Sequence, residues 1–323
     1  MTSAPGIGLA SPRPASPVRL TVIVPATNRP ATLGLCLAAI RDAAAAPEQV
    51  IVVDDPSIRH PALARNAGAR QATGDVLVFV DADVTVHPDA FTRIRRALEA
   101  DPALVALFGS YDDAPAAPGI VSVFRNLLHH HVHHSEAGPA STFWAGLGAM
   151  RRDAFEAAGG FSVHPIEDIE LGMRLSEGGA RILLDPTVQG THLKQWSLYS
   201  MLRTDLLVRG IPWVGLLLRY RGSASTSALN LGWRHRLSAL ACLALLAAAP
   251  LRSLWIVVVA LTLLVALNFS FYRLLVRREG LPRAICGVGL HILHQLVAVA
   301  AVPLGILAYL VRRRTARERP STA

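Results

Sequence analysis

Three apolar runs in the first third of the chain, each followed at once by polar residues, constrain its fold more than any other feature. They read "RLTVIVPA", "QVIVVDD" and "DVLVFVDAD". Short runs rich in Val, Ile and Leu are typical of strands buried on both faces. A segment with helical periodicity follows each run, the last being "PDAFTRIRRALEAD". This order predicts an α/β fold with a mainly parallel sheet and helices on both faces.

The polar residues that follow the three runs should meet at one edge of this sheet. They are Thr27 and Asn28, Asp54 and Asp55, and Asp81 with Asp83. Ligands of open α/β sheets bind beyond the carboxyl ends of the strands. We therefore expect the ligand site at this edge.

Two interpretations fit Asp81 and Asp83, which flank a single alanine. Aspartate is common where strands turn, although like charges this close repel each other. Alternatively, two carboxylates at the mouth of a sheet can hold Mg²⁺ or Mn²⁺ together with the phosphates that such a cation carries. The spacing alone favours neither, but the other polar residues expected at the same edge favour the cation.

Charge is divided unevenly along the chain. Residues 1–200 hold 16 basic and 20 acidic residues, whereas residues 201–323 hold 16 basic and 3 acidic ones, a net charge of +13. Arginines beside long apolar runs indicate anionic lipid headgroups rather than nucleic acid, and they also flank membrane helices on the cytoplasmic side. The three widely spaced cysteines suggest neither disulfides nor a metal site, which fits a reducing cytosolic face.

Composition divides the chain into five expected regions. For the third region, residues 201–236, an ordinary surface helix packed on the domain is the alternative. The regions are a disordered N-terminal tail (1–18), an α/β domain (19–200), amphipathic interfacial helices (201–236), two or three transmembrane or re-entrant helices (237–311) and a basic C-terminal tail (312–323).

The arginines around the last apolar segment pose a topological problem. The segments Arg273 to Arg283 and Arg312 to Arg319 are both expected on the cytoplasmic side. A single crossing between them cannot satisfy both. Either the last segment is a re-entrant hairpin, or the first short apolar segment does not span. The expected location is the cell membrane, multi-pass, with the α/β domain in the cytoplasm.

Six motifs together resemble those of family 2 glycosyltransferases, in order and in rough spacing. They are "VIVPATNRPATL", "VIVVDDPS", "ARNAGARQATGDVLVFVDADV", "FWAGLGAMRRDAF", "GGFSVHPIEDIELGMRL" and "THLKQWS". The resemblance covers about residues 19–220 and implies a GT-A fold, a nucleotide-diphosphate sugar as donor and hexosyl transfer.

The resemblance also implies a nucleotide-sugar site at the expected edge. Its members would be Pro25, Thr27, Asn28, Asp55, Arg65 and Asp81. Asp55 would accept a hydrogen bond from the imide N–H of the base. The sequence departs from the family at Pro56, where glycine is commoner, so the loop after Asp55 should have a different shape.

In the same resemblance, the Asp81-Ala82-Asp83 triplet becomes a DXD motif that binds Mn²⁺ or Mg²⁺. Asp83 would ligate the cation directly, and Asp81 would bind ribose or support the site. A divalent cation neutralises the charge that develops on a diphosphate leaving group. His192 aligns with a further ligand of some relatives, although imidazole suits Mn²⁺ less well than carboxylate does. A histidine held by hydrogen bonds at a strand end is the alternative.

Glu167 and Asp168 resemble the family's ED motif, in which the Asp is the general base. An inverting transfer needs a base that takes the proton from the acceptor hydroxyl as it attacks the anomeric carbon. "IELGMRLSEGG" follows and reads as a helix, so the alternative role for Asp168 is an N-cap. One residue can serve both roles.

The acceptor side is implied by two segments. "FWAGLGAMRR" places Trp144 and Gly146 there, and "KQWS" adds Trp196 and Lys194, the only lysine in the chain. Lys194 could meet a donor or acceptor phosphate. "KQWS" lacks the spacing of the Q-x-x-R-W signature of processive synthases, which argues against a polymerising enzyme.

The run "HHHVHH", residues 129–134, is open to two interpretations. Histidine-rich tracts can bind Zn²⁺. The run also follows "VSVFRNLL", and if it continues that helix its side chains point in different directions. We favour the second interpretation, a helix near the acceptor cleft or the membrane interface.

The sequence is therefore interpreted as a membrane-anchored, metal-dependent, inverting glycosyltransferase with a lipid-linked or membrane-associated acceptor. An active site held at a membrane meets lipid acceptors at high effective concentration. Two alternatives remain: a degenerate transferase-like membrane scaffold or binding protein, and a nucleotidyltransferase. The latter needs a basic phosphate loop near the first strand, where only Arg29 is present.

Overall fold

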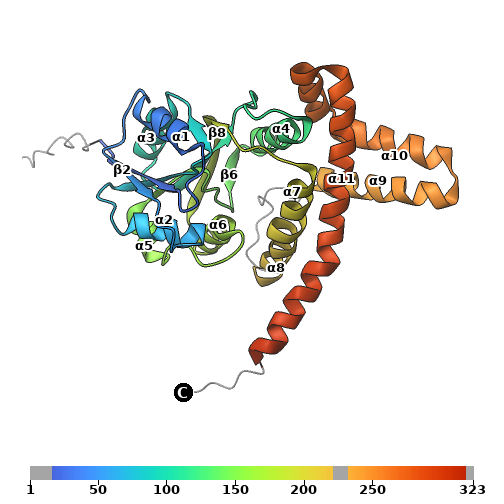
Figure 1. The fold of residues 1–323 in the computed structure, drawn as a ribbon. Helices are drawn as coiled ribbons and strands as arrows, with labels where there is room; N and C mark the ends of the chain where they lie inside the picture. The colour runs from blue at the N-terminus through green and yellow to red at the C-terminus, as the bar shows by residue number, and fades with distance from the viewer. Residues whose placement is uncertain (1–16, 221–231, 318–323) are drawn as a thin grey trace, which may run out of the picture.

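The structure, a computed structural model, describes residues 17–220 and 232–317. Most of the expected N-terminal tail (1–18), part of the third region (201–236) and the end of the basic tail (312–323) lie outside these residues. The described chain has an α/β domain and, beside it, a group of C-terminal helices that includes a protruding hairpin (Figure 1).

One sheet forms the centre of the α/β domain. Its order is β2-β1-β3-β7-β5-β8-β4, and the short β6 pairs with β8. The strands are β1 Leu20–Pro25, β2 Gln49–Val53, β3 Val76–Val80, β4 Val84–Val86, β5 Leu104–Tyr111, β6 Gly138–Ala140, β7 Leu147–Arg151 and β8 Arg181–His192.

The sheet is mixed, which differs from the mainly parallel sheet expected. β1 pairs in parallel with β2 and β3, and β5 with β8, but β7 runs antiparallel to both β3 and β5. The α/β class and the three expected strands are confirmed. The strand β7 lies between β3 and β5 and runs in the opposite direction to both. The residues just before β7 therefore lie beside the carboxyl end of β3, where Leu147 pairs with Val80.

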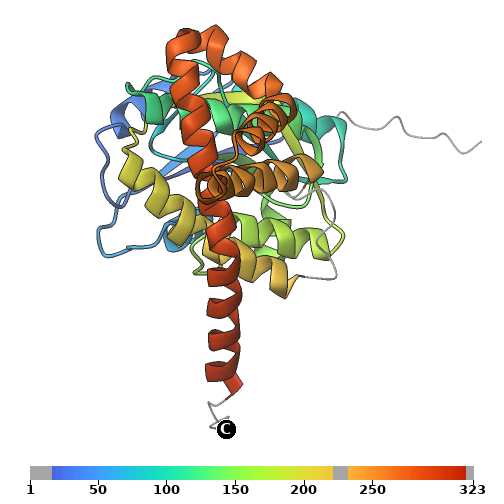
Figure 2. The same cartoon turned by 90° about the vertical axis from the view of Figure 1, so that its right-hand side faces the viewer.

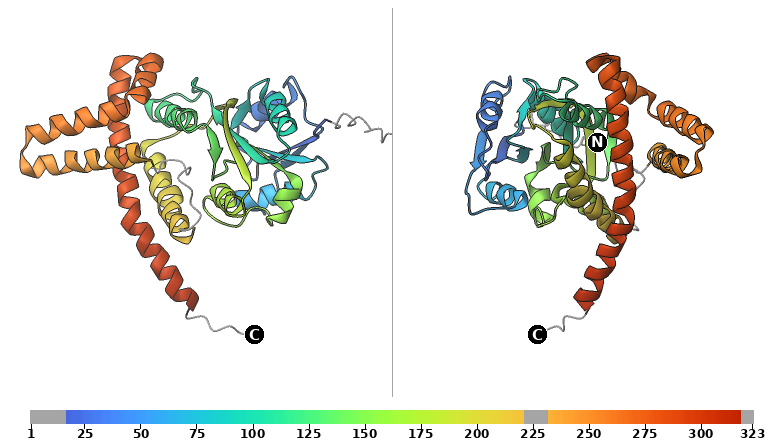
Figure 3. Two further views of the ribbon diagram at one scale, coloured as in Figure 1. Left: turned by 180° about the vertical axis from the view of Figure 1, so that it is seen from behind. Right: turned by 45° about the vertical axis from the view of Figure 1, so that its right-hand side comes forward.

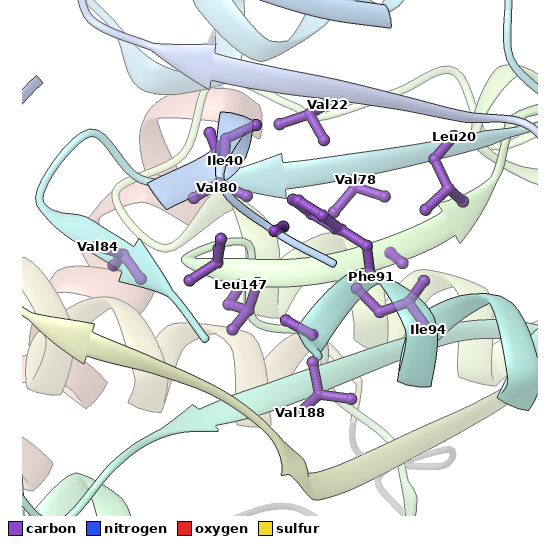
Figure 4. Close-up of a cluster of buried hydrophobic side chains, with 14 of the residues drawn as sticks. Leu20, Val22, Ile40, Val78, Val80, Val84, Phe91, Ile94, Leu147 and Val188 are labelled. Carbon is purple, nitrogen blue, oxygen red and sulfur yellow. The ribbon is translucent and has the colours of Figure 1, made fainter. Parts of the chain in front are cut away.

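Helices cover both faces of the sheet. Alternate residues of β1 and β3 point to opposite sides. Leu20, Val22, Val78 and Val80 pack against α1 and α3, whereas Ile23, Leu77 and Phe79 pack against α2, α5 and α6 (Figure 4 shows the first cluster). These strands are therefore buried on both faces, as their unbroken apolar sequence predicts.

The helices of the α/β domain alternate with the strands. Three of them match the periodic segments of the sequence to within three residues at each end. They are α1 Leu33–Arg41, α2 Pro61–Ala69, α3 Ala90–Ala100, α4 Ile120–Ser135, α5 Arg152–Ala157 and α6 Glu167–Glu177.

The C-terminal helices begin after β8. α9 and α10 form a hairpin that projects from α11 on the side away from the sheet, in two opposite views (Figures 1 and 3). α11 bends at Gly280, whose backbone is not helical. The helices are α7 Leu198–Arg203, the π-helix η1 Thr204–Gly210, α8 Ile211–Arg219, α9 Trp233–Leu251, α10 Leu254–Leu267 and α11 Phe269–Arg317.

Among the described residues, one helix is long and apolar enough to cross a membrane, over residues 269–314. α10 is apolar but shorter. Length and composition alone are weak grounds for a crossing.

A pair of glycine variants tests how tightly α6 is packed. A Cβ at Gly172 would lie 2.1 Å from the backbone nitrogen of Phe143, whereas one at Gly34 of α1 would meet nothing within 4 Å. We expect Gly172→Ala to lower the free energy of unfolding by about 1–3 kcal/mol. Gly34→Ala should raise it by about 0.5–1 kcal/mol, because alanine is the better helix former. Thermal unfolding of both variants in one detergent measures this, and a stable Gly172→Ala protein would contradict the close packing.

Candidate active site

The ends of β1 and β2 form the more exposed part of the polar edge. Thr27 and the exposed Asn28 lie in the turn after β1, where Arg29 makes an exposed ion pair with Asp54 at 3.3 Å. Asp55 is exposed and accepts a hydrogen bond from the backbone N–H of Ser57 at 2.8 Å. Hydrogen bonding from the Ser57 hydroxyl and from its backbone N–H lowers the pKa of Asp55. Both carboxylates are thus open to a ligand.

Arg65 of α2 ties two halves of the site together. It donates to Asp81 Oδ1 at 2.7 Å and to Glu167 Oε1 at 2.5 Å, and its side chain is only 6% exposed. Its guanidinium also lies over the ring of Phe161, 5.5 Å from the centroid. The end of β3 and the start of α6 are therefore joined through one buried cation.

Burial and charge shift the titration of this group. Burial raises the pKa of Glu167 to about 7, and the Arg65 guanidinium opposes that rise. Burial lowers the pKa of Arg65, but the carboxylates of Asp81 and Glu167 reverse this and hold it above its ordinary value. Arg65 is therefore a permanent cation, whereas Glu167 can exchange a proton near neutral pH.

Backbone hydrogen bonds fix the segment from Asp81 to Asp83. Asp81 N–H donates to Gly146 O at 3.0 Å, and Leu193 N–H donates to Asp83 O at 2.8 Å. The Thr32 hydroxyl donates to Ala82 O at 2.9 Å. These contacts come from residues that directly adjoin β7, β8 and α1, so the ends of three elements position the two aspartates.

Asp83 lies beside His192. Their side chains approach to 3.7 Å between Nε2 and Oδ2, because Val84 of β4 pairs with His192 of β8. Burial raises the pKa of Asp83, but His192 and the positive charge of Lys194 lower it overall. An ionised carboxylate next to an imidazole is a donor set that fits a divalent cation.

Within residues 17–220 and 232–317, no group of three or more Asp, Glu, His or Cys side chains is arranged so that it could hold a metal ion by itself. A cation at Asp83 and His192 would therefore take its remaining ligands from a diphosphate and from water. Asp81 faces Arg65 instead, which suits the supporting role expected of it.

Asp168 is the second residue of α6 and not its N-cap, which is Ile166. One carboxylate oxygen accepts from Ile169 N–H at 2.8 Å and the other from Ala145 N–H at 3.2 Å. The second bond directs the carboxylate toward the segment just before β7. Asp168 thus lies between the acidic edge and the segment that carries Trp144 and Gly146.

A row of aromatic rings extends from that segment to His192. Trp144 packs on Tyr111 and on His129, and Tyr111 stacks on His192 with centroids 4.2 Å apart. Gly146 allows this packing, since a Cβ there would lie 2.3 Å from the Trp144 ring. Sequence reasoning missed Tyr111, whose only signal was its place at the end of a strand.

The histidine run lies in the helix α4, as expected, and its side chains point in different directions. His129 faces the aromatic row, His133 donates through Nδ1–H to Gly109 O at 2.9 Å, and His131 packs on Phe271 of α11. Burial lowers the pKa of His129 well below its ordinary value. The run is therefore a set of residues that pack in the aromatic row, on β5 and against α11.

Lys194 and Trp196 have different surroundings. Lys194 is exposed, with its ammonium 4.5 Å from the centroid of the Trp196 ring. Trp196 is buried among Phe124, Met201 and Phe271. The structure thus places Trp196 in the contact between the α/β domain and the C-terminal helices, and leaves Lys194 near Asp83.

Sequence reasoning also missed a buried ionic cluster near Tyr111 of the aromatic row. Arg125 of α4 pairs with Asp205 of η1 at 3.0 Å, and Asp205 also bonds to His294 of α11 at 2.9 Å. Burial lowers the pKa of Arg125 to about 10, and the nearby charge of Arg209 adds to this. The three partners come from segments far apart in the sequence, so no local pattern could reveal them.

Part of this chain is similar to known glycosyltransferases. Residues 59–159 match the family profile described as "Glycosyl transferase family 2". The pre-mycofactocin glycosyltransferase of Mycobacterium tuberculosis, found in two strains, is 28% identical over 263 residues, covering 69% of this chain and 51% of the relative. The chain thus spans about half the length of the curated relatives it matches.

A solved structure shows the same fold. It is the mannosyltransferase PcManGT from Pyrobaculum calidifontis in complex with GDP-Man and Mn²⁺. The TM-score is 0.53 at 17% identity, covering 93% of this chain and 89% of that one. The likeness at this identity concerns the fold, and it includes the GT-A sheet.

The pKa of Glu167 leads to a pH-dependent prediction. Since its folded pKa of about 7 lies above the ordinary value of 4.5, its stabilising effect is complete below about 4.5 and is lost as pH rises through about 7. Relative to Glu167→Gln, we expect the free energy of unfolding of the native protein to fall by about 2–3 kcal/mol across that window.

Urea unfolding in detergent at several pH values measures this difference. The control Glu156→Gln changes an exposed glutamate of α5 and should keep the pH profile of the native protein. A native profile that runs parallel to that of Glu167→Gln would contradict the raised pKa.

Proposed function

Because this chain carries a family 2 glycosyltransferase domain with the GT-A fold, we propose that it transfers a sugar from a nucleotide-diphosphate donor, with inversion, to an acceptor held at a membrane. One observation carries the proposal. Asp81, Asp83, Glu167 and Asp168 meet at the carboxyl edge of the sheet, although up to 87 residues separate them, and Arg65 joins two of them.

The nucleotide would bind at the ends of β1 and β2. Pro25 and Thr27 would line the base, Asn28 would approach it from the turn, and the exposed, ionised Asp55 would accept from an imide N–H. Asp81, held by Arg65, would meet the ribose. The accessibility of these residues supports this arrangement.

Asp83 and His192 are the residues that would hold Mn²⁺ or Mg²⁺. When bound, such a cation neutralises charge on the diphosphate leaving group. Lys194, the exposed cation whose charge lowers the pKa of Asp83, would contact the same phosphates. The Mn²⁺ and GDP-Man in the mannosyltransferase PcManGT support a metal and a nucleotide sugar as the ligand class.

Asp168 is the proposed general base. Its carboxylate takes the proton from the acceptor hydroxyl while the oxygen bonds to the anomeric carbon and the bond from that carbon to the diphosphate breaks. The Ala145 N–H bond holds the carboxylate beside Trp144, whose half-buried ring offers a face to the acceptor. Glu167 keeps Arg65, and therefore Asp81, in place.

The acceptor is proposed to be lipid-linked or membrane-associated. The helix α11 and the hairpin α9/α10 all lie on one side of the domain that carries the site, the side that faces the viewer in Figure 2, which supports attachment to a membrane through them. The chain is proposed to act at the cell membrane with its catalytic domain in the cytoplasm.

A membrane-bound nucleotide-sugar-binding protein without transfer activity is the second candidate. Pro56 favours it, since it replaces a glycine that is commoner at this loop. The two candidates share a donor site but differ in their need for a base, so Asp168 separates them.

Donor binding tests the proposed metal site. Detergent-purified protein is titrated calorimetrically with UDP- and GDP-sugars, with and without Mn²⁺. We expect metal-dependent binding of one donor, weakened at least ~100-fold in Asp83→Ala, because that variant loses a charged ligand. Asp89→Ala, at an exposed aspartate beside α3, should bind as the native protein does. Native protein that is folded and binds none of the donors would overturn the proposal.

The transfer reaction tests the base. Asp168→Asn should release nucleoside diphosphate about 10²–10⁴-fold more slowly in the presence of extracted membrane lipids, with donor affinity unchanged. If neither native protein nor variant turns over the donor it binds, the binding-protein candidate takes precedence.

A further inference from the structure

The polarity of α11 beyond Gly280 is the reverse of that expected for a helix on a soluble domain. Its polar residues His291, His294 and Gln295 face the protein, and two of them are almost fully buried. The outward face carries Ile285, Val302 and further exposed apolar residues. No Asp, Glu, Lys or Arg lies between Arg283 and Arg312. A helix with its apolar face turned outward requires an apolar neighbour.

Two well-separated points of this helix are held to the catalytic domain. Near the first end, Arg278 makes an ion pair with Asp113, which follows β5. About seven turns farther on, Gly305 packs on Val214 of α8, and Leu216 of that helix packs on Ile166 and Met173 of the catalytic domain. A helix that crossed a bilayer would carry one of its ends away from a domain on one side.

The middle of the helix also excludes a crossing. His294 bonds to Asp205, which pairs with Arg125, and both of these side chains are more than nine-tenths buried. Gly210 and Gly305 permit close contact along the next turns, where a Cβ on either would lie within 2.8 Å of Ala301 or Val214. A crossing would place this ionic cluster near the centre of the bilayer, where ionisable groups are costly.

The hairpin α9/α10 extends from the outward face of α11. Its base packs on Ile292 and Leu296, and its shaft points away from the domain (Figures 1 and 3). The apolar part of α9, from Leu237 to Leu251, is about 22 Å long at 1.5 Å per residue. Trp233 near the base and Trp255 near the tip are both about three-quarters exposed, as tryptophans at membrane interfaces are.

We propose that residues 281–314 of α11 lie in the plane of the membrane surface, and that the hairpin α9/α10 alone enters the hydrocarbon. This rests on the membrane attachment included in the proposed function. The partner is a bilayer with anionic headgroups, because residues 201–323 carry a net charge of +13 and arginines stand at both ends of the apolar face of α11.

This arrangement resolves the problem that the sequence poses. Arg273 to Arg283 and Arg312 to Arg314 lie on the same side as the catalytic domain, although one helix joins them. It replaces the expectation that the last apolar segment crosses the membrane or folds into a hairpin, and assigns the hairpin to α9 and α10.

Labelling of single cysteines tests the plane of α11. In a chain without its own cysteines, Asp89→Cys marks the catalytic domain, Arg283→Cys and Arg313→Cys mark the two ends of the helix, and a membrane-impermeant maleimide is applied to sealed vesicles of each orientation. We expect all three sites to react from the same face. Reaction of Arg313→Cys from the face opposite to Asp89→Cys overturns the in-plane helix but leaves membrane attachment intact.

Release of the native protein from the vesicles by an alkaline wash would instead overturn membrane attachment itself, and with it this inference. Donor turnover by the released protein, measured in parallel, shows whether the transferase proposal survives on its own. The two failures are therefore distinguishable.

A second variant tests the hairpin. Leu246→Glu with Val259→Glu places two charges on exposed parts of α9 and α10. Partitioning onto vesicles of phosphatidylcholine and phosphatidylglycerol should fall at least ~100-fold. The control Leu35→Glu alters a residue of α1 with the same exposure as Val259, 59%, and should partition as the native protein does. Circular dichroism checks that each variant is folded. Equal partitioning of the double variant and the native protein would overturn insertion of the hairpin.

Discussion

The ion pairs of Arg65 are the interaction on which the site depends. A guanidinium with so little exposure is costly to bury, and its two carboxylates must be well placed to compensate. Asp81 comes from the end of a strand and Glu167 from the start of a helix 86 residues later. The helix α2 holds Arg65 on the face of the sheet that α5 and α6 also cover. The two ion pairs of Arg65 therefore fix the distance between the end of β3 and α6, the helix that carries Asp168.

The reversed strand β7 then completes the site. A strand that runs antiparallel to β3 brings the residues before it to the carboxyl end of β3, where Gly146 O accepts from Asp81 N–H. The same short segment presents Ala145 N–H to Asp168. Its backbone is pressed against Gly172 of α6, so the acceptor-side segment and the base share one rigid contact. A wholly parallel sheet would have placed this segment at the other edge.

The sequence was sufficient for those parts of the molecule that local patterns specify. The buried strands, the helices that follow them and the carboxylates at their ends were predictable, because an apolar period and a strand end are visible within ten residues. Tyr111, Arg125 and Asp205 were not, since each acquires its role from a partner at least 80 residues away. Trp196 shows the same limit: its motif suggested the acceptor side, while its burial depends on α4 and α11. The mixed sheet could not be foreseen either, because the direction in which β7 enters is set by tertiary packing.

In the proposed arrangement, the ionic cluster of Arg125, Asp205 and His294 also sets the position of the site relative to the membrane. Arg125 lies on α4, the helix that also carries His129 of the aromatic row beside Trp144. Through Asp205 it is joined to His294, which lies on the helix whose other face is apolar. If that face rests on lipid, the distance from the bilayer to the aromatic row is fixed by side chains already in contact and needs no hinge.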